Sequence, residues 1–196
     1  LTLIDKKVNK NIELSLDEMK FLYEMDNEIE GFGYEKDPRI QEIQSKRNQK
    51  KDCALIYNIS EDEVALSQGE WRKNPKQFKV LLSNLMLDHL KSADGLTLPK
   101  IIYGSLYLNT LTNAKNLTLP KIVHRSLKLN HLTTVEELIL PERIGKDLYL
   151  NRLTGEENLI LPKIVGGSVY LRGLKYVKQL TLPETVGENL YLDSLV

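Results

Sequence analysis

The side chains that could bind a metal ion are histidines at three places, His89, His124 and His131. His89 and His131 share one position of a repeat described below and lie two copies apart, which corresponds to roughly 9–10 Å at the spacing of stacked strands. One zinc ion cannot bridge that distance, because its bonds to histidine are about 2 Å long. His124 could approach His131 only around a corner of the chain. We therefore expect no metal site.

Nucleophilic chemistry has equally little support. Cys53, the single cysteine, lies in the apolar run CALIYNI and is expected to be a buried structural thiol. No Ser-His-Asp or Cys-His spacing indicates a catalytic site, and the glycines do not form a phosphate-binding loop. The sequence thus predicts a protein that is not an enzyme and has no cofactor and no small-molecule substrate.

The charges argue against several classes of partner. Lysine and arginine together number 27, as do aspartate and glutamate, so the formal net charge is zero. Zero net charge argues against a nucleic-acid partner, because a basic surface normally drives that binding by releasing counterions. A single cysteine permits no intrachain disulfide, and no apolar run reaches the length of about 18 residues that a membrane span needs. We expect a cytoplasmic protein without a membrane partner.

The elements that would position a surface site follow from a repeat in the second half of the chain. Five prolines recur at intervals of 21 residues, each preceded by Leu-Thr-Leu or Leu-Ile-Leu. Further aliphatic residues recur three, seven, nine and twelve residues after the proline. Such a pattern is typical of a solenoid, whose coils must stack to bury their apolar faces. The prolines are Pro99, Pro120, Pro141, Pro162 and Pro183.

Each copy contains two alternations, Leu-x-Leu-Pro and Leu-x-Leu, which predict two short strands with every second residue directed inward. The proline is expected at the corner after the first strand, where no backbone donor is needed. Glycines before the second strand, such as Gly104 and Gly187, are expected to allow the turn. Short polar residues that could bond the turn backbone share one position: Ser105, Ser126, Asp147, Ser168 and Asn189.

One column of outward residues differs from a plain strand surface. The residue between the two leucines of the second strand is tyrosine in four copies, and tyrosine offers large contact area and a hydroxyl group at protein interfaces. A structural explanation also holds, because tyrosine favours strands and stacked aromatics stabilise them. A neighbouring column of asparagines ends at an arginine. The candidate partner-binding residues are Tyr107, Lys128, Tyr149, Tyr170, Tyr191 and Arg172.

These positions carry a resemblance to a known class of repeat. The pattern L-T-L-P-x-x-[IV]-x-G-x-L-Y-L-x-x-L-T resembles the 21-residue, leucine-rich, β-solenoid-like repeats of bacterial and phage- or mobile-element-associated proteins. Several such proteins have a helical segment before the array, similar to FLYEMDNEIEGFGYEKDPRI at residues 21–40. The resemblance implies a compact β-solenoid and an interaction role, and it implies no activity.

The first part of the chain contains helix signals. Ser15 and Glu18 form a capping box before an apolar pattern over residues 16–29. Asp37 and Pro38 are typical of the first residues of a second helix.

Three further segments lead to local predictions. The apolar run at residues 53–59 predicts a strand. Ser60 and Glu63 form another capping box, for a short helix that Gly69 would end. The spacing of LTL and IEL in residues 1–14 resembles a degenerate coil, which would make the helices an insertion in a longer array.

The predicted fold class is α+β: a short, mostly helical N-terminal region over residues 1–77, followed by a parallel β-solenoid over residues 78–196 with five to six leucine-rich-like coils of 21 residues. The chain starts without methionine and stops within a coil. We therefore expect a fragment, a processed product or only the ordered part of a longer protein, and the uncapped last coil makes self-association possible.

Three functions remain open at this point. The leading hypothesis is a non-enzymatic protein–protein interaction module. The second is a phage or mobile-element inhibitor or modulator of a bacterial defence system that acts by binding. The third is a substrate-recruiting array of a longer enzyme or effector. Each has a protein partner whose identity the sequence does not give.

Overall fold

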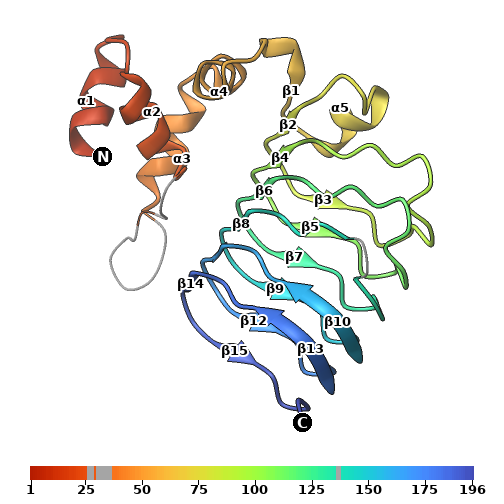
Figure 1. Cartoon of the computed structure of the whole chain (residues 1–196). Helices are drawn as coiled ribbons and strands as arrows, with labels where there is room; N and C mark the ends of the chain where they lie inside the picture. Colours follow the sequence, from red (N-terminus) through yellow and green to blue (C-terminus); the bar gives the residue numbers. More distant parts are fainter. Residues whose placement is uncertain (26–28, 30–36, 136–137) are drawn as a thin grey trace. The chain divides into compact units, whose positions relative to one another are not determined.

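A computed structural model of the chain describes residues 1–25, 29, 37–135 and 138–196 (Figure 1). These residues form two compact units, Leu1–Val64 and Ala65–Val196. The first is helical and the second is a parallel β-solenoid of about five coils. The predicted α+β class, with a helical start and a solenoid after it, is confirmed.

The helical unit consists of short helices, some of which are capped at the first turn by a side chain. The Ser15 hydroxyl accepts the Glu18 N–H at 3.2 Å, and the Glu18 carboxylate accepts the Ser15 N–H at 2.8 Å, which confirms the predicted capping box. The Asp37 carboxylate accepts the Arg39 N–H at 3.0 Å at the start of a later helix. The elements described in this unit are α1 (Thr2–Asn9), α2 (Leu16–Leu22), α3 (Arg39–Ser45), α4 (Gln49–Tyr57) and the 3-10 turn η2 (Glu61–Glu63).

Two helices in this unit replace elements that the sequence predicted differently. Residues 2–9 form α1, so residues 1–14 are not a degenerate coil. The run at residues 53–59 was predicted as a strand but belongs mostly to α4, because Asn48 caps the Lys51 N–H at 3.1 Å and a left-handed Asn58 ends the helix. A short apolar run does not distinguish a buried strand from one face of a helix.

The helix predicted over residues 16–29 is shorter than its apolar pattern. α2 ends at Leu22, and Glu24 already has φ = 52°, which no α-helix contains. Half of the segment 21–40, which carried part of the family resemblance, lies outside the described residues.

Two parallel sheets run along the solenoid, and from residue 80 onward each of their strands pairs with its equivalent one coil away (Figure 1). The 21-residue period of the sequence is therefore the register of the sheets. The seven-stranded sheet contains β1 (Val64–Ala65), β2 (Val80–Leu81), β4 (Ile101–Ile102), β6 (Ile122–Val123), β8 (Arg143–Ile144), β11 (Ile164–Val165) and β14 (Thr185–Val186). The six-stranded sheet contains β3 (Leu85–Met86), β5 (Leu106–Tyr107), β7 (Leu127–Lys128), β9 (Leu148–Tyr149), β12 (Val169–Tyr170) and β15 (Leu190–Tyr191).

The strand predicted at Leu-x-Leu-Pro forms only in two late coils, as β10 (Gly155–Ile160) and β13 (Tyr176–Thr181). In earlier coils the first leucine turns its N–H to its own coil: Leu96 donates to the Ala93 carbonyl at 3.0 Å, and Leu117 to the Ala114 carbonyl at 2.9 Å. That N–H is no longer free for a neighbouring strand. The seven-stranded sheet instead uses the residues just after the proline.

The core of the solenoid is a stack of aliphatic side chains, one set from each coil. Leu106, Leu127 and Leu148 are completely buried at equivalent positions of three successive coils. Fully burying a leucine contributes about 2–3 kcal/mol. The stack therefore holds the coils together, although no single coil could bury its apolar face alone.

Helix α5 (Gln68–Lys73) covers the first coil of the solenoid. Trp71 is buried in the same apolar core as Phe78, and the Gln68 side chain accepts the Met86 N–H at 2.8 Å and donates to the Met86 carbonyl at 3.1 Å. The edge strand β3 thus has its backbone groups satisfied by a side chain. Gly69 lies inside this helix and does not end an earlier one, which corrects the prediction from the second capping box.

The turn glycines serve close approach between coils rather than unusual backbone angles. Gly166 and Gly187 have no positive φ, but a Cβ at either would overlap a backbone carbonyl oxygen of the preceding coil. A larger residue there would push neighbouring coils apart.

Candidate functional site

The predicted column of outward residues is a continuous ridge on the six-stranded sheet, which we call the tyrosine face. The strand register aligns Met86, Tyr107, Lys128, Tyr149, Tyr170 and Tyr191 on successive coils. All except the exposed Met86 are half-buried. The alignment that the repeat predicted is present, and the partner-binding role of these residues remains a prediction.

The tyrosine rings stack on each other along the solenoid. The ring centroids of Tyr149 and Tyr170 are 4.5 Å apart with an interplanar angle of 1°, and those of Tyr170 and Tyr191 are 4.8 Å apart at 11°. Tyr170 therefore has a ring on each of its faces. A molecule that approaches from outside meets ring edges and hydroxyl groups rather than open ring faces.

Two cations complete the column. The Lys128 Nζ atom lies 5.1 Å from the Tyr107 ring centroid and 5.2 Å from that of Tyr149, so the ammonium is held between two rings. The Arg172 guanidinium carbon lies 5.5 Å and 4.8 Å from the rings of Tyr170 and Tyr191. Every predicted partner-binding residue thus contacts another member of the same set.

A ladder of short polar side chains borders the tyrosines. The Ser105 hydroxyl accepts the Ser126 N–H at 3.2 Å, and an Asp147 oxygen accepts the Ser168 N–H at 2.9 Å, one coil further in each case. The sequence suggested bonds within the turn, but these bonds join neighbouring coils. They explain why Ser105, Ser126 and Ser168 are buried.

Asp147 connects this ladder to the tyrosine column. It accepts a hydrogen bond from the Tyr149 hydroxyl at 3.2 Å. Burial and the neighbouring Asp147 carboxylate raise the pKa of Tyr149 to about 12. The phenol is therefore a neutral hydrogen-bond donor at physiological pH.

The neighbouring column of asparagines forms a ladder of side-chain hydrogen bonds on the other side of the tyrosine column. Asn130 donates to the Asn109 side-chain oxygen at 3.1 Å, and Asn151 donates to that of Asn130 at 2.9 Å. The ladder ends where Arg172 replaces asparagine, and the Asn151 Oδ1 atom is buried without a hydrogen-bond partner among the described residues. Arg172 instead lies 3.4 Å from Asp193.

The histidines do not form a metal site in the described part of the chain, which contains no cluster of three potential ligands. His124 stacks on Tyr103, with ring centroids 4.4 Å apart. Burial, with a smaller effect of nearby Arg143, lowers the pKa of His124 to about 4. Cys53 is completely buried, as the sequence suggested.

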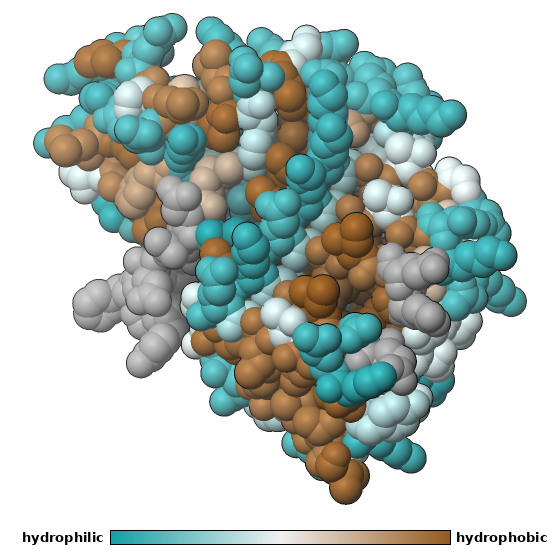
Figure 2. Space-filling model, in the orientation of Figure 1, coloured by the Kyte–Doolittle hydropathy of each residue, from teal (hydrophilic) through white to brown (hydrophobic). Residues whose placement is uncertain are grey.

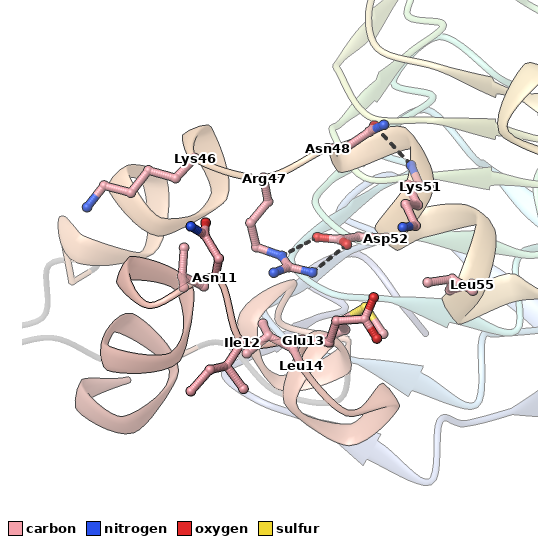
Figure 3. Close-up of a pocket in the computed structure, with 12 residues that line it drawn as sticks. Asn11, Ile12, Glu13, Leu14, Lys46, Arg47, Asn48, Lys51, Asp52 and Leu55 are labelled. Atoms are coloured by element: carbon pink, nitrogen blue, oxygen red, sulfur yellow. Dashed lines mark hydrogen bonds and ion pairs between the residues drawn. The ribbon is translucent and has the colours of Figure 1, made fainter.

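The helical unit contains a pocket of about 300 Å³ that the sequence did not suggest (Figure 3). Figure 3 shows Arg47 directed at Asp52, and its Nε and Nη2 atoms donate to the carboxylate at 2.6 and 2.7 Å. The Tyr23 hydroxyl also donates to Asp52, at 3.0 Å. Lys46 at the pocket is paired with Glu42 at 2.8 Å. Two of the cations that line this pocket are thus already neutralised within the unit.

The rest of the solenoid surface offers charged and apolar columns. The residue after the proline is exposed in every coil, and a hydrophilic band follows this side of the solenoid in Figure 2. Ile139 and Ile160 are 85% and 68% exposed at equivalent positions of neighbouring coils. Within the described residues no helix is long and apolar enough to cross a membrane. The charged column consists of Lys100, Lys121, Glu142, Lys163 and Glu184.

The fold and this surface define a parallel β-solenoid with 21-residue coils, a helical unit before it and an aromatic–cationic ridge on one sheet. Comparisons with protein-family models, with curated proteins and with solved structures found no match to this chain.

Proposed function

We propose that this chain is a non-enzymatic protein–protein interaction module and that its tyrosine face is the binding surface. The observation that carries the proposal is the continuous column of half-buried tyrosines with Lys128 and Arg172 held against their rings. Tyrosine and arginine are enriched at the energetic centres of protein interfaces. A rigid sheet holds them in place, so little conformational entropy is lost on binding.

The roles of the neighbouring polar groups support a binding function rather than catalysis. Asp147 accepts hydrogen bonds from Tyr149 and from the Ser168 backbone, and the Ser168 hydroxyl donates to Glu188 at 2.9 Å. These groups stabilise the stack of coils. A general base or a nucleophile would need freedom to exchange such partners with a substrate.

The test is capture of a partner from a bacterial lysate by the immobilised chain, compared between two variants. Replacement of Tyr149, Tyr170 and Tyr191 by serine is expected to abolish capture of the specific partner. The matched control replaces the exposed Ile139 and Ile160 by serine and is expected to retain it. Undiminished capture by the folded triple-serine variant would contradict the proposal.

The cellular setting is a narrower part of the same proposal. The repeat resemblance supports a bacterial or phage-associated protein, and the single cysteine supports a cytoplasmic location. In that setting the partner would be a component of a bacterial defence system, and the chain would modulate it by binding. Expression in bacteria that carry a defence system should then raise phage plating efficiency, and the triple-serine variant should not.

A further inference from the structure

The tyrosine face uses its acidic and basic side chains differently, although the whole chain is neutral. Its carboxylates are bonded within the solenoid. Asp88 accepts the Asn109 N–H at 2.7 Å, Asp147 accepts the Ser168 N–H at 2.9 Å, and Glu188 accepts the Ser168 hydroxyl at 2.9 Å. Asp193 is near Arg172. These hydrogen bonds leave the carboxylates charged but hold them against their framework donors.

One cation on the same face, Lys128, is held without an ion pair among the described residues, whereas Arg172 is paired with Asp193 at 3.4 Å. Among the described residues, Lys128 has no carboxylate within ion-pair distance, and its ammonium lies between two tyrosine rings. A cation–π contact orients a charge but leaves its net value unchanged. Arg125, in the turn before β7, and Arg152, in the coil after that of Lys128, are exposed. Lys128 thus offers an unpaired positive charge to a carboxylate of a partner.

We propose that the tyrosine face binds an acidic polypeptide segment, whose carboxylates pair with Lys128 and take the place of Asp193 at Arg172. This inference rests on the proposed function and names the partner's chemistry. Lys128 and Arg172 belong to coils two steps apart, about 9–10 Å along the solenoid. A polyproline II segment has three residues per turn and rises about 3.1 Å per residue, so acidic residues at positions i and i+3 lie on one side of it about 9 Å apart and match the two cations.

The covered ring faces favour an acidic polypeptide over a single-stranded nucleic acid as the ligand of this surface. Proteins that bind single strands stack bases on open aromatic faces. Here Tyr149 and Tyr191 cover both faces of Tyr170, and Lys128 lies against Tyr149. A carboxylate needs no open ring face, because it can pair with the cations held beside the rings.

The experiment measures binding of fluorescent peptides to the full chain by anisotropy. The probe is a peptide of about a dozen residues with glutamate at every third position, which repeats the spacing of about 9 Å. The comparison probes are the same peptide with glutamine in place of glutamate, one of equal composition with its glutamates clustered, and oligothymidine of similar charge. The expected order has the spaced glutamate peptide bind most tightly.

The variants separate this site from general attraction between charges. Lys128→Glu with Arg172→Glu should weaken binding of the spaced peptide by about tenfold or more. Lys121→Glu with Lys163→Glu makes the same charge change in the same two coils, at exposed positions after the prolines, and should change binding less than about twofold. Thermal unfolding of each variant checks that it is folded, and glutamine replaces glutamate if it is not.

Each contrary outcome overturns the inference. Equal weakening in both double variants would indicate non-specific attraction, tighter binding of oligothymidine would indicate a nucleic-acid surface, and no binding of the spaced peptide would exclude an acidic partner. If the triple-serine variant loses its captured partner but the Lys128/Arg172 variant keeps it, the interaction function stands and only the acidic chemistry fails.

Discussion

Lowering the pH should destabilise the solenoid through one histidine. His124 is stacked on Tyr103, and its burial lowers its pKa from 6.5 to about 4. Because the folded state binds this proton less readily than the unfolded chain, the stabilisation is complete above about pH 6.5 and is lost as the pH falls toward 4. Between pH 8 and pH 5 these two pKa values correspond to a loss of about 2 kcal/mol in the free energy of unfolding.

The assay is urea unfolding followed by circular dichroism at about pH 8 and about pH 5, on the wild type and on His124→Phe. Phenylalanine keeps an aromatic ring against Tyr103 but cannot be protonated. All other titrating groups are common to both proteins, so the difference between their pH dependences isolates His124. Equal pH dependence in the wild type and His124→Phe would refute the reasoning.

Two further predictions concern the close approach at a turn glycine and the ionisation of a tyrosine on the tyrosine face. Gly166→Ala should lower the free energy of unfolding by about 2 kcal/mol or more, because its Cβ would overlap the carbonyl oxygen of Gly145. Gly69→Ala, in helix α5 with ordinary van der Waals space, should be neutral or slightly stabilising in the same urea titration. Tyr149 should ionise only near pH 12 in an absorbance titration, and Asp147→Asn should lower that pKa. An unchanged Tyr149 titration in Asp147→Asn would exclude the carboxylate as a cause.

Alkaline unfolding follows from the same tyrosine. Since the folded-state pKa of Tyr149 is raised to about 12, its contribution to stability is present below the ordinary value of 10 and is lost as the pH rises through 12. The partial burial of the ring makes this contribution smaller than that of a fully buried group.

The repeat allowed much of the solenoid to be predicted because its period is also its strand register. Once Leu106, Leu127 and Leu148 are aligned by sequence, their stacking follows from the need to bury them together. The alignment of Tyr107 with Lys128 comes from the same register. Predictions of which residues align between coils depend on the spacing of the repeat, which can be read directly from the sequence.

Local hydrogen-bond choices were less predictable. The Leu96 N–H bonds to Ala93 of its own coil rather than to a neighbouring strand, and the alternation of leucines does not distinguish these outcomes. The apolar run around Cys53 became a helix because Asn48 and Asn58 cap it. The ladder through Ser126 joins coils, which no single copy of the repeat could indicate.

The position of Arg172 offers a separate test of function against stability. Asparagine at this position would continue the ladder, since each side-chain N–H₂ donates to the oxygen one coil earlier, and Asn151 Oδ1 is buried without a partner in the described structure. Arg172→Asn should therefore stabilise the solenoid by about 1 kcal/mol, because the exposed ion pair with Asp193 contributes little. Arg152→Asn is the control: it changes the exposed residue that directly follows Asn151 and should leave the free energy of unfolding unchanged.

If Arg172 serves only to hold Tyr170 and Tyr191 together, its replacement should destabilise the chain. If the chain gives up a hydrogen bond to keep a cation on the tyrosine face, the same replacement should raise the urea midpoint while it weakens binding of the acidic peptide. Such opposed effects on stability and binding are expected where a functional residue breaks a local structural rule. A variant that is both less stable and equally good at binding would show that Arg172 belongs to the framework.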